Sequence, residues 1–430
     1  MNSTQSPAGI TAAPFARVMY VMAKPSGARC NLRCEYCYYL EKSALTGSGY
    51  GKPSAGVSEE TSAGVSEETS AGAGTMPGEQ MDEGLLEKFI REYIAAQTTP
   101  EVLFIWHGGE PMLRGLEFYR KALRLEKKYA FGRAVDNSIQ TNGTLITEEW
   151  CRFFKDNGFL VGVSIDGPEP LHDRFRRNRA GAPSFRRVMR GIELLDRYGV
   201  QWNAMATVNS ENVTHPTEFY DFFKSIGCRY VQFTPVVERF RTLPDGRRCL
   251  ATPADTDAVL TDFSITPDQW GDFLCSVFDR WWNGGDVGKQ FIQIFDATLA
   301  GWMGQPPGLC AFARECGHAG VLEHNGDLYS CDHFVFPEYR LGNLAEKSLV
   351  EMMYSREQQN FGAAKYTSLP RQCRECKFLF ACNGECPKNR FATADDGERG
   401  LNYLCRGYRR FFEHSAPAMM RMRDSILAMR

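Results

Sequence analysis

The chain has 430 residues, which is room for two or three domains of ordinary size. Hydrophobic residues make up 43% and charged residues 24%, as in soluble globular proteins, so neither a disordered chain nor a membrane protein is expected. A net charge of −2 offers no attraction for nucleic acid or an anionic membrane. The first ten residues lack the features of a signal peptide, and we therefore expect a cytoplasmic protein.

Short apolar runs alternate with amphipathic stretches from residue 17 to about residue 234. The runs with strand character are Val18–Ala23, Val102–Trp106, Asn137–Gln140, Leu160–Ile165, Asn203–Val208 and Tyr230–Phe233. The stretches with apolar residues at helical spacing are Glu83–Ala96, Leu116–Lys128, Glu148–Asn157, Phe185–Tyr198 and Pro216–Ser225. Six strands separated by five helices indicate parallel βαβ units, and we predict an open or closed α/β barrel over residues 15–240.

One segment interrupts this alternation. The sequence SAGVSEET at Ser54–Thr61 is repeated at Ser62–Thr69, in a small, polar and acidic stretch with little to bury. We predict a flexible insertion without chemistry over residues 48–75, and a flexible N-terminus over residues 1–14.

The second half of the chain changes in composition. We predict a connecting helical region over residues 241–306, with helices at Pro267–Asn283 and Lys289–Met303. Cysteines then become dense over residues 307–412, and a C-terminal helix is expected over 413–430. In a reducing compartment fifteen cysteines favour metal binding or catalysis over disulfide bonds.

Three cysteines follow the first predicted strand with the spacing C-x3-C-x2-C. They are Cys30, Cys34 and Cys37. Three thiolates can hold three irons of a four-iron cluster and leave the fourth iron without a protein ligand. Free or zinc-binding thiols are the alternative, but zinc requires a fourth ligand and no histidine is close in the sequence.

With an aromatic residue before its last cysteine, this loop resembles that of the radical S-adenosylmethionine enzymes. The resemblance implies a partial (β/α)6 barrel in which the open iron binds S-adenosylmethionine, whose reductive cleavage yields a 5′-deoxyadenosyl radical. Five positions match the family's cofactor contacts, with an ordinary polar strand end as the alternative for Ser164 and a solvated basic helix start for Arg176. Those positions are Tyr36, Gly109 in the GGE segment, Ser164, Arg176 and Val237.

Eight further cysteines lie in the last 121 residues of the chain. Their spacing resembles the SPASM-type extension of the same superfamily, which implies two auxiliary four-iron clusters. By this resemblance the inner cluster is held by Cys310, Cys316, Cys331 and Cys386, and the outer cluster by Cys373, Cys376, Cys382 and Cys405. A pair of four-cysteine zinc sites is the alternative. The four scattered cysteines, Cys151, Cys228, Cys249 and Cys275, are expected to be buried small hydrophobic residues.

The resemblance extends along nearly the whole chain to one family. The phrases WHGGEP, QTNGTL, VSIDGP, EHNGDLYSCDH and GLNYLC are similar to anaerobic sulfatase-maturating enzymes, which oxidise a cysteine or serine of a sulfatase to Cα-formylglycine. This implies a sulfatase polypeptide as substrate and a small electron-donor protein of the flavodoxin or ferredoxin type. It also implies Asp332 as general base, with Tyr39 and His107 lining the substrate pocket.

Two other functions compete with this interpretation. Another SPASM-type peptide modifier, such as a thioether cross-linking maturase, would share both cysteine sets without needing an aspartate after Cys331. An iron–sulfur electron carrier would not need the loop of Cys30, Cys34 and Cys37. The sequence leaves open whether cysteine, serine or both are oxidised.

Overall fold

The computed structural model describes residues 19–42, 80–244, 246 and 248–429. The predicted flexible N-terminus and the repeat insertion lie outside the described residues. No helix in the described part of the chain is both long and apolar enough to cross a membrane.

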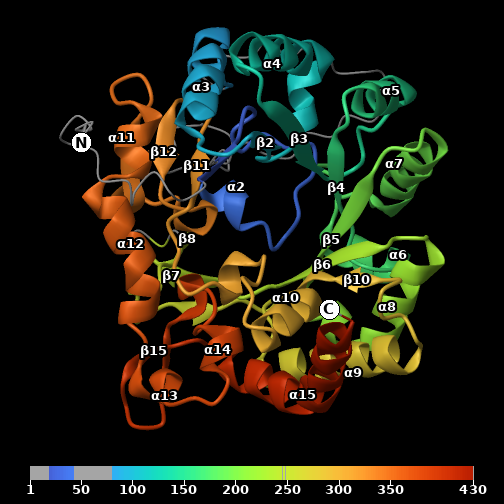
Figure 1. Ribbon diagram of the computed structural model, residues 1–430, viewed down its shortest axis with the longest axis vertical. Coiled ribbons are helices and arrows are strands. Elements are labelled where there is room, and N and C mark those ends of the chain that lie inside the picture. The colour runs from blue at the N-terminus through green and yellow to red at the C-terminus, as the bar shows by residue number, and fades with distance from the viewer. Residues whose placement is uncertain (1–18, 43–79, 245, 247, 430) are drawn as a thin grey trace, which may run out of the picture.

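Six parallel strands form the centre of the molecule (Figure 1). They are β1 (Tyr20–Ala23), β2 (Glu101–Trp106), β3 (Ala134–Thr141), β4 (Leu160–Ser164), β5 (Trp202–Val208) and β6 (Tyr230–Pro235). The strands lie side by side in the order of the sequence, and every neighbouring pair is parallel. The sheet does not close on itself, because other strands extend both of its edges. The predicted partial (β/α)6 barrel is therefore confirmed.

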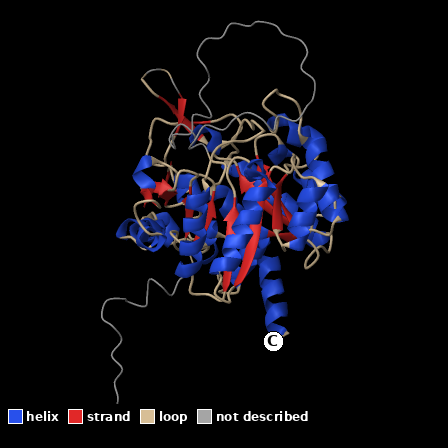
Figure 2. Ribbon diagram, turned by 90° about the horizontal axis from the view of Figure 1, so that it is seen from above, coloured by secondary structure: helices blue, strands red, loops and turns tan. Residues whose placement is uncertain are grey.

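Helices cover the outer face of these strands, as Figures 1 and 2 show. They are α3 (Glu83–Ala96), α4 (Gly115–Tyr129), α5 (Glu148–Asp156), α6 (Glu169–Phe175), α7 (Phe185–Arg197) and α8 (Pro216–Ser225). Local sequence determines several of their first turns. Asp82 caps α3 by accepting a hydrogen bond from the Leu85 amide, and Thr147 caps α5 in the same way. A short helix inside the barrel, α2 (Tyr38–Lys42), begins directly after Cys37.

The sheet continues into the cysteine-rich part of the chain. Strand β11 (Ala319–Leu322) pairs in parallel with β1, and β12 (Asp327–Tyr329) and β13 (Arg340–Asn343) follow in antiparallel order. At the opposite edge, β10 (Phe291–Ile292) pairs with β6. Backbone hydrogen bonds therefore fasten the C-terminal part of the chain to the first barrel strand. This pairing brings the turn between β11 and β12, which begins with Glu323, to the barrel end where the three-cysteine loop lies.

The remaining elements are short except for four helices, α9, α10, α12 and α15. They are β7 (Arg239–Thr242), β8 (Arg248–Leu250), β9 (Val259–Leu260), α9 (Pro267–Asn283), α10 (Gln293–Trp302), α11 (Leu349–Met353), α12 (Arg356–Thr367), α13 (Arg371–Arg374), α14 (Leu379–Cys382), β14 (Ala392–Thr393), β15 (Arg399–Leu401) and α15 (Cys405–Ala428). Helix α9 has the predicted bounds and begins with a capping box formed by Thr266 and Gln269. Helix α10 begins later than predicted because β10 takes up the residues before it.

The C-terminal helix begins at Cys405 rather than at residue 413. It packs closely along α9, where a Cβ atom on Gly407 would lie 2.2 Å from the Pro267 carbonyl oxygen. Phe411 packs between Phe278 and Phe295, at ring distances of 5.9 and 5.5 Å. These contacts fix the start of α15, and with it the position of Cys405.

Candidate active site

The three-cysteine loop lies between β1 and α2, at the carboxyl ends of the parallel strands. In such sheets this end carries the functional side chains. The GGE segment after β2 packs against the loop: the Gly109 amide donates to Gly27 O at 2.8 Å, and the Glu110 amide to Arg29 O at 2.8 Å. A Cβ atom on Gly109 would lie 2.3 Å from Arg29 O, so this position requires glycine for close packing.

Burial makes the three thiols poor acids when no metal is bound. It raises the pKa of Cys34 to about 12, and it also raises the pKa of Cys30 and Cys37. A bound metal ion displaces the proton of a thiol ligand outright, so buried thiols with raised pKa values remain suitable ligands. The Asn142 side-chain amide donates to the Cys30 sulfur at 3.7 Å and ties the loop to the end of β3.

Two of the predicted cofactor contacts, Tyr36 and Arg176, belong to one buried network. The Tyr36 hydroxyl donates to Asp166, which follows β4, and the Arg176 guanidinium donates to the Tyr36 hydroxyl at 2.8 Å. The Thr207 amide donates to the second Asp166 oxygen at 2.9 Å. Arg176 Nε is buried without a hydrogen-bond partner. The network therefore presents an unsatisfied donor next to the cysteine loop.

The other predicted cofactor positions lie at the same end of the sheet. Ser164, the last residue of β4, accepts a hydrogen bond from the Gln140 side chain at 3.0 Å. Val237 follows β6 and is buried. A loop with three half-buried thiols beside an unpartnered guanidinium donor fits a four-iron cluster and a carboxylate-bearing cofactor.

Asp332 is the residue on which the two halves of the chain converge. It lies directly after Cys331, and its carboxylate accepts hydrogen bonds from Lys24 on one oxygen and from the Tyr38 hydroxyl on the other. The Lys42 ammonium donates to its backbone oxygen at 2.8 Å. Burial acts to raise the pKa of Asp332, but the positive charges of Lys24 and Lys42 hold it well below its usual range. The side chain is therefore a carboxylate at neutral pH.

Tyr39 and His107 lie near Asp332 but bond to other groups. The Tyr39 hydroxyl donates to Glu323 Oε2 at 2.5 Å, and the Lys24 ammonium lies 3.4 Å from the centre of the Tyr39 ring. His107 Nδ1 accepts a hydrogen bond from the Gly108 amide at 2.8 Å. Burial lowers the pKa of His107, so the ring is neutral and carries its proton on Nε2.

Sequence reasoning missed three residues around Asp332, namely Lys24, Tyr38 and Glu323. Lys24 and Glu323 are buried, with side-chain exposures of 1% and 0%. Lysine and glutamate are ordinarily surface residues, and no local pattern marks these two as buried. Tyr38 stands beside Tyr39 in the sequence, and only the direction in which α2 points decides which tyrosine reaches Asp332.

The eight C-terminal cysteines fall into two electrostatic groups. Burial raises the pKa of Cys331 to about 12, and the neighbouring thiols Cys310 and Cys316 add to the rise. Burial likewise raises the pKa of Cys405 to about 12, with contributions from Cys373 and Cys376.

The remaining cysteine of each predicted set, Cys386 in the inner set and Cys382 in the outer set, is influenced by the other cysteines of its own set. The pKa of Cys386 is raised by burial and then by Glu385, Cys331 and Cys310, and that of Cys382 by burial and then by Cys405, Glu385 and Cys373. The buried Glu385 carboxylate thus acts on both groups.

None of the fifteen cysteines forms a disulfide bond. Within the residues that the structure describes, no three His, Cys, Asp or Glu side chains converge closely enough to hold a single metal ion. The cysteines of a four-iron cluster each bind a different iron, so they need not converge on one point.

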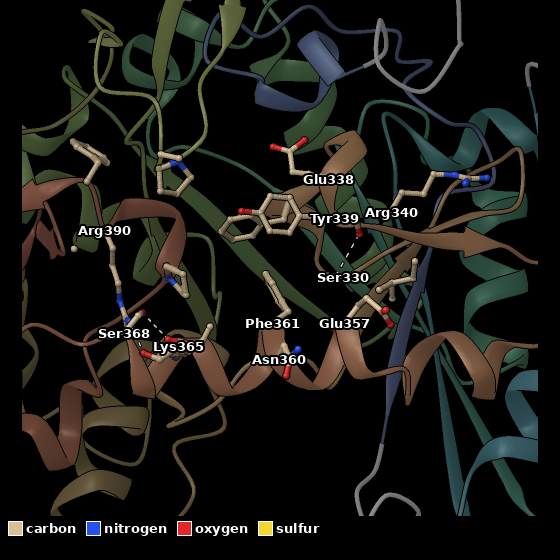
Figure 3. A pocket seen from close by; sticks show the side chains of 18 of the residues that line it. Ser330, Glu338, Tyr339, Arg340, Glu357, Asn360, Phe361, Lys365, Ser368 and Arg390 are labelled. Atoms are coloured by element: carbon tan, nitrogen blue, oxygen red, sulfur yellow. Dashed lines mark hydrogen bonds between the residues drawn. The ribbon is translucent and has the colours of Figure 1, made fainter.

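A pocket of about 760 Å³ lies beside α12 (Figure 3). Its walls are α12, the segment between β12 and β13, and residues 387–391 and 399–400, with Pro253 and Ala254 at one side. Ser330 and Phe334 line it, whereas Cys331 and Asp332 between them do not. The pocket is therefore adjacent to the Asp332 site and separate from it.

Comparison with known proteins matches both parts of the chain to protein families. Residues 25–223 match the family model described as Radical SAM superfamily, and residues 310–377 match the model described as Iron-sulfur cluster-binding domain. The chain is 56% identical to the serine-type anaerobic sulfatase-maturating enzyme of Bacteroides thetaiotaomicron, over 97% of this chain and 94% of that protein. It is 35% identical to the serine-type enzyme of Klebsiella aerogenes, over 91% and 84% of the two chains.

More distant relatives share the same architecture. The cysteine-type anaerobic sulfatase-maturating enzyme of Clostridium perfringens is 28% identical, over 94% of this chain and 98% of that protein. The solved structure described as native anSMEcpe with bound AdoMet and Cp18Cys peptide superposes with a TM-score of 0.77 and 27% identity, covering 95% of this chain and all of that one.

Proposed function

The chain belongs to the anaerobic sulfatase-maturating enzymes of the radical S-adenosylmethionine superfamily, and on this premise we propose that it oxidises a serine of a sulfatase polypeptide to Cα-formylglycine without oxygen. The observation that carries the proposal is the Asp332 carboxylate, which adjoins Cys331 and is held by Lys24 and Tyr38 from the barrel. Support for serine as the oxidised residue comes from the 56% identity to a serine-type relative, against 28% to a cysteine-type one.

The proposed cofactor ligands lie in two separate parts of the chain. The barrel, residues 15–240, would hold a four-iron cluster through Cys30, Cys34 and Cys37, and S-adenosylmethionine through Tyr36, Gly109, Ser164, Arg176 and Val237. The segment of residues 307–412 would hold two more clusters, the inner one on Cys310, Cys316, Cys331 and Cys386, and the outer one on Cys373, Cys376, Cys382 and Cys405. When bound, the first cluster and S-adenosylmethionine supply the radical that removes a hydrogen atom from the Cβ of the substrate serine.

The chain's own residues complete the oxidation. After losing one Cβ hydrogen atom, the serine side chain must lose one proton and one electron to become an aldehyde. Asp332 is the proposed acceptor of the proton, because it is deprotonated at neutral pH and adjoins a proposed ligand of the inner cluster. We propose that the His107 Nε2–H points at the substrate oxygen. We also propose that Tyr39, which is bonded to Glu323, forms part of the wall of the substrate pocket. The electron that the substrate loses would pass to the inner cluster when that cluster is bound. A small flavodoxin- or ferredoxin-type protein is the proposed donor of the electron that cleaves S-adenosylmethionine.

A pair of peptides tests this function directly. The anaerobically prepared protein is incubated with S-adenosylmethionine, a reductant and two peptides that differ only in serine or cysteine at the target position. We expect formylglycine from the serine peptide, detected by mass as the loss of two hydrogen atoms, with one 5′-deoxyadenosine for each product. A cross-linked peptide instead of an aldehyde would favour a thioether maturase, and the absence of any modified peptide would contradict the proposal.

The iron content tests the cluster number. We expect about twelve irons per chain after anaerobic preparation, because three plus eight cysteines provide the ligands of three four-iron clusters. Metal analysis by mass spectrometry, together with assay of acid-labile sulfide, measures this value. Stoichiometric zinc with only about four irons would show that the C-terminal cysteines form zinc sites.

A further inference from the structure

Helix α2 connects the three-cysteine loop to Asp332. The helix begins one residue after Cys37, and Tyr38 and Lys42 lie four residues apart, on one face of it. The Tyr38 hydroxyl donates to Asp332 Oδ2, and the Lys42 ammonium donates to the Asp332 backbone oxygen at 2.8 Å. The carboxylate and the main chain of one residue are therefore held by two side chains of one helical turn.

Lys42 lies in surroundings that are unusual for a lysine. Its side chain is fully buried, and its ammonium lies 4.7 Å from the centre of the Tyr38 ring and 5.3 Å from that of Phe336. A buried ammonium is costly unless its hydrogen bonds and neighbours compensate. Packing alone therefore does not explain why Lys42 is buried, and its hydrogen bond to Asp332 supplies a further reason.

Tyr38 is fixed from both sides. Its ring packs edge to face against His333 at 5.7 Å, and the Lys388 ammonium lies 5.3 Å from its centre. His333 follows Asp332, and Lys388 lies two residues after Cys386. The ring thus fits between α2 and the two segments that carry inner-set cysteines, which leaves its hydroxyl little freedom to point elsewhere.

We propose that Tyr38 and Lys42 are positioning residues: together they hold the Asp332 carboxylate in the orientation from which it takes up the substrate proton. Lys24 holds the other carboxylate oxygen from the end of β1. This inference rests on the proposed role of Asp332 as general base. It adds that the loop binding the first cluster and the segment carrying the base move as one unit, because α2 is bonded to both.

The chain contains a matched control for this arrangement. On α8, Tyr220 and Lys224 are also four residues apart, and both donate to the Asp286 carboxylate at 2.6 Å. This pair lies outside the proposed machinery. The variants Tyr220→Phe and Lys224→Met therefore remove the same groups from a helix of the same kind without touching Asp332.

The test compares Tyr38→Phe and Lys42→Met with the two control variants at equal iron content. It measures formylglycine formed per 5′-deoxyadenosine, and the KM and kcat for the serine peptide. We expect the ratio and kcat to fall about 10- to 100-fold in the α2 variants, because small displacements of a catalytic group cost rates of this order. The peptide KM and 5′-deoxyadenosine formation should stay within about threefold, and the α8 variants should match the parent within about twofold.

Two further variants separate positioning from other roles. Lys42→Arg keeps the charge and a donor, and it should recover part of the activity lost in Lys42→Met. Tyr38→Phe added to Asp332→Asn should cause no further loss, because a residue acting through Asp332 has no effect once the carboxylate is gone. A further loss in that background, or a parent-like ratio in both α2 variants while Asp332→Asn is impaired, would overturn the positioning role. A parent-like Asp332→Asn enzyme would instead overturn the proposed base, and the inference with it.

Discussion

Cys34→Ala is expected to abolish 5′-deoxyadenosine formation. Cys34 is the middle cysteine of the loop and a proposed iron ligand, and two thiolates hold a four-iron cluster poorly, so the proposed cofactor site would be lost with it. The thiol is half-buried, which raises its pKa, and the nearby Arg176 guanidinium acts to lower it. The alanine variant therefore removes a proposed iron ligand beside that guanidinium. Chromatography of anaerobic reactions with S-adenosylmethionine and a reductant measures the nucleoside.

Cys249→Ala is the matched control, because Cys249, which was expected to be buried, is a half-buried thiol of β8 and belongs to none of the three proposed cysteine sets. It should form 5′-deoxyadenosine at the parent rate and retain the parent iron content. The outer-set variant Cys405→Ala should act differently, through folding or through the exit of the electron. A well-folded Cys34→Ala protein that still made 5′-deoxyadenosine at the parent rate would show that this loop is not where the radical is generated.

Asp332→Asn is expected to lower formylglycine formation by about 10²–10⁴-fold, the usual effect of losing a general base. The amide has nearly the shape of the carboxylate but cannot take up the substrate proton. Production of 5′-deoxyadenosine should persist to some degree, uncoupled from product, since radical generation does not need this proton transfer. Peptide mass spectrometry and nucleoside chromatography on the same reactions give both quantities.

Loss of the Asp332 charge also leaves Lys24 without its nearest carboxylate. Breaking a buried ion pair costs about 3–5 kcal/mol of stability when the remaining charge finds no partner. Glu323 Oε1 lies 3.8 Å from the Lys24 ammonium and offers a second partner, so we expect the variant to remain folded. Thermal unfolding and iron content check this, with Asp286→Asn as the matched control away from the site. Equal rate and yield of formylglycine in the parent and in Asp332→Asn would transfer the base to another residue, with Tyr39 and His107 the next to test.

Local sequence alone determined most of the barrel. The six strands and five main helices were predictable because each has its own periodicity, and Asp82 before α3 and Thr147 before α5 mark two of the helix starts. The spacing of Cys30, Cys34 and Cys37 identified candidate ligands for the same reason, since a short loop brings its own residues together, whereas the eight C-terminal cysteines were assigned only by the family resemblance. Patterns of this kind depend only on residues that are close together in the sequence, so they can be recognised without knowledge of the tertiary structure.

Tertiary structure decided which residues surround Asp332. The pairing of β1 with β11 joins residues about 300 positions apart, with Tyr20 opposite Ala319, and no local pattern encodes that register. This pairing brings Lys24 to the Asp332 carboxylate, while the direction of α2 brings Tyr38 there and turns Tyr39 to Glu323. Buried charges such as Lys24 and Glu323 are stable only because each finds partners from distant parts of the chain, and sequence patterns record neighbours along the chain rather than across the fold.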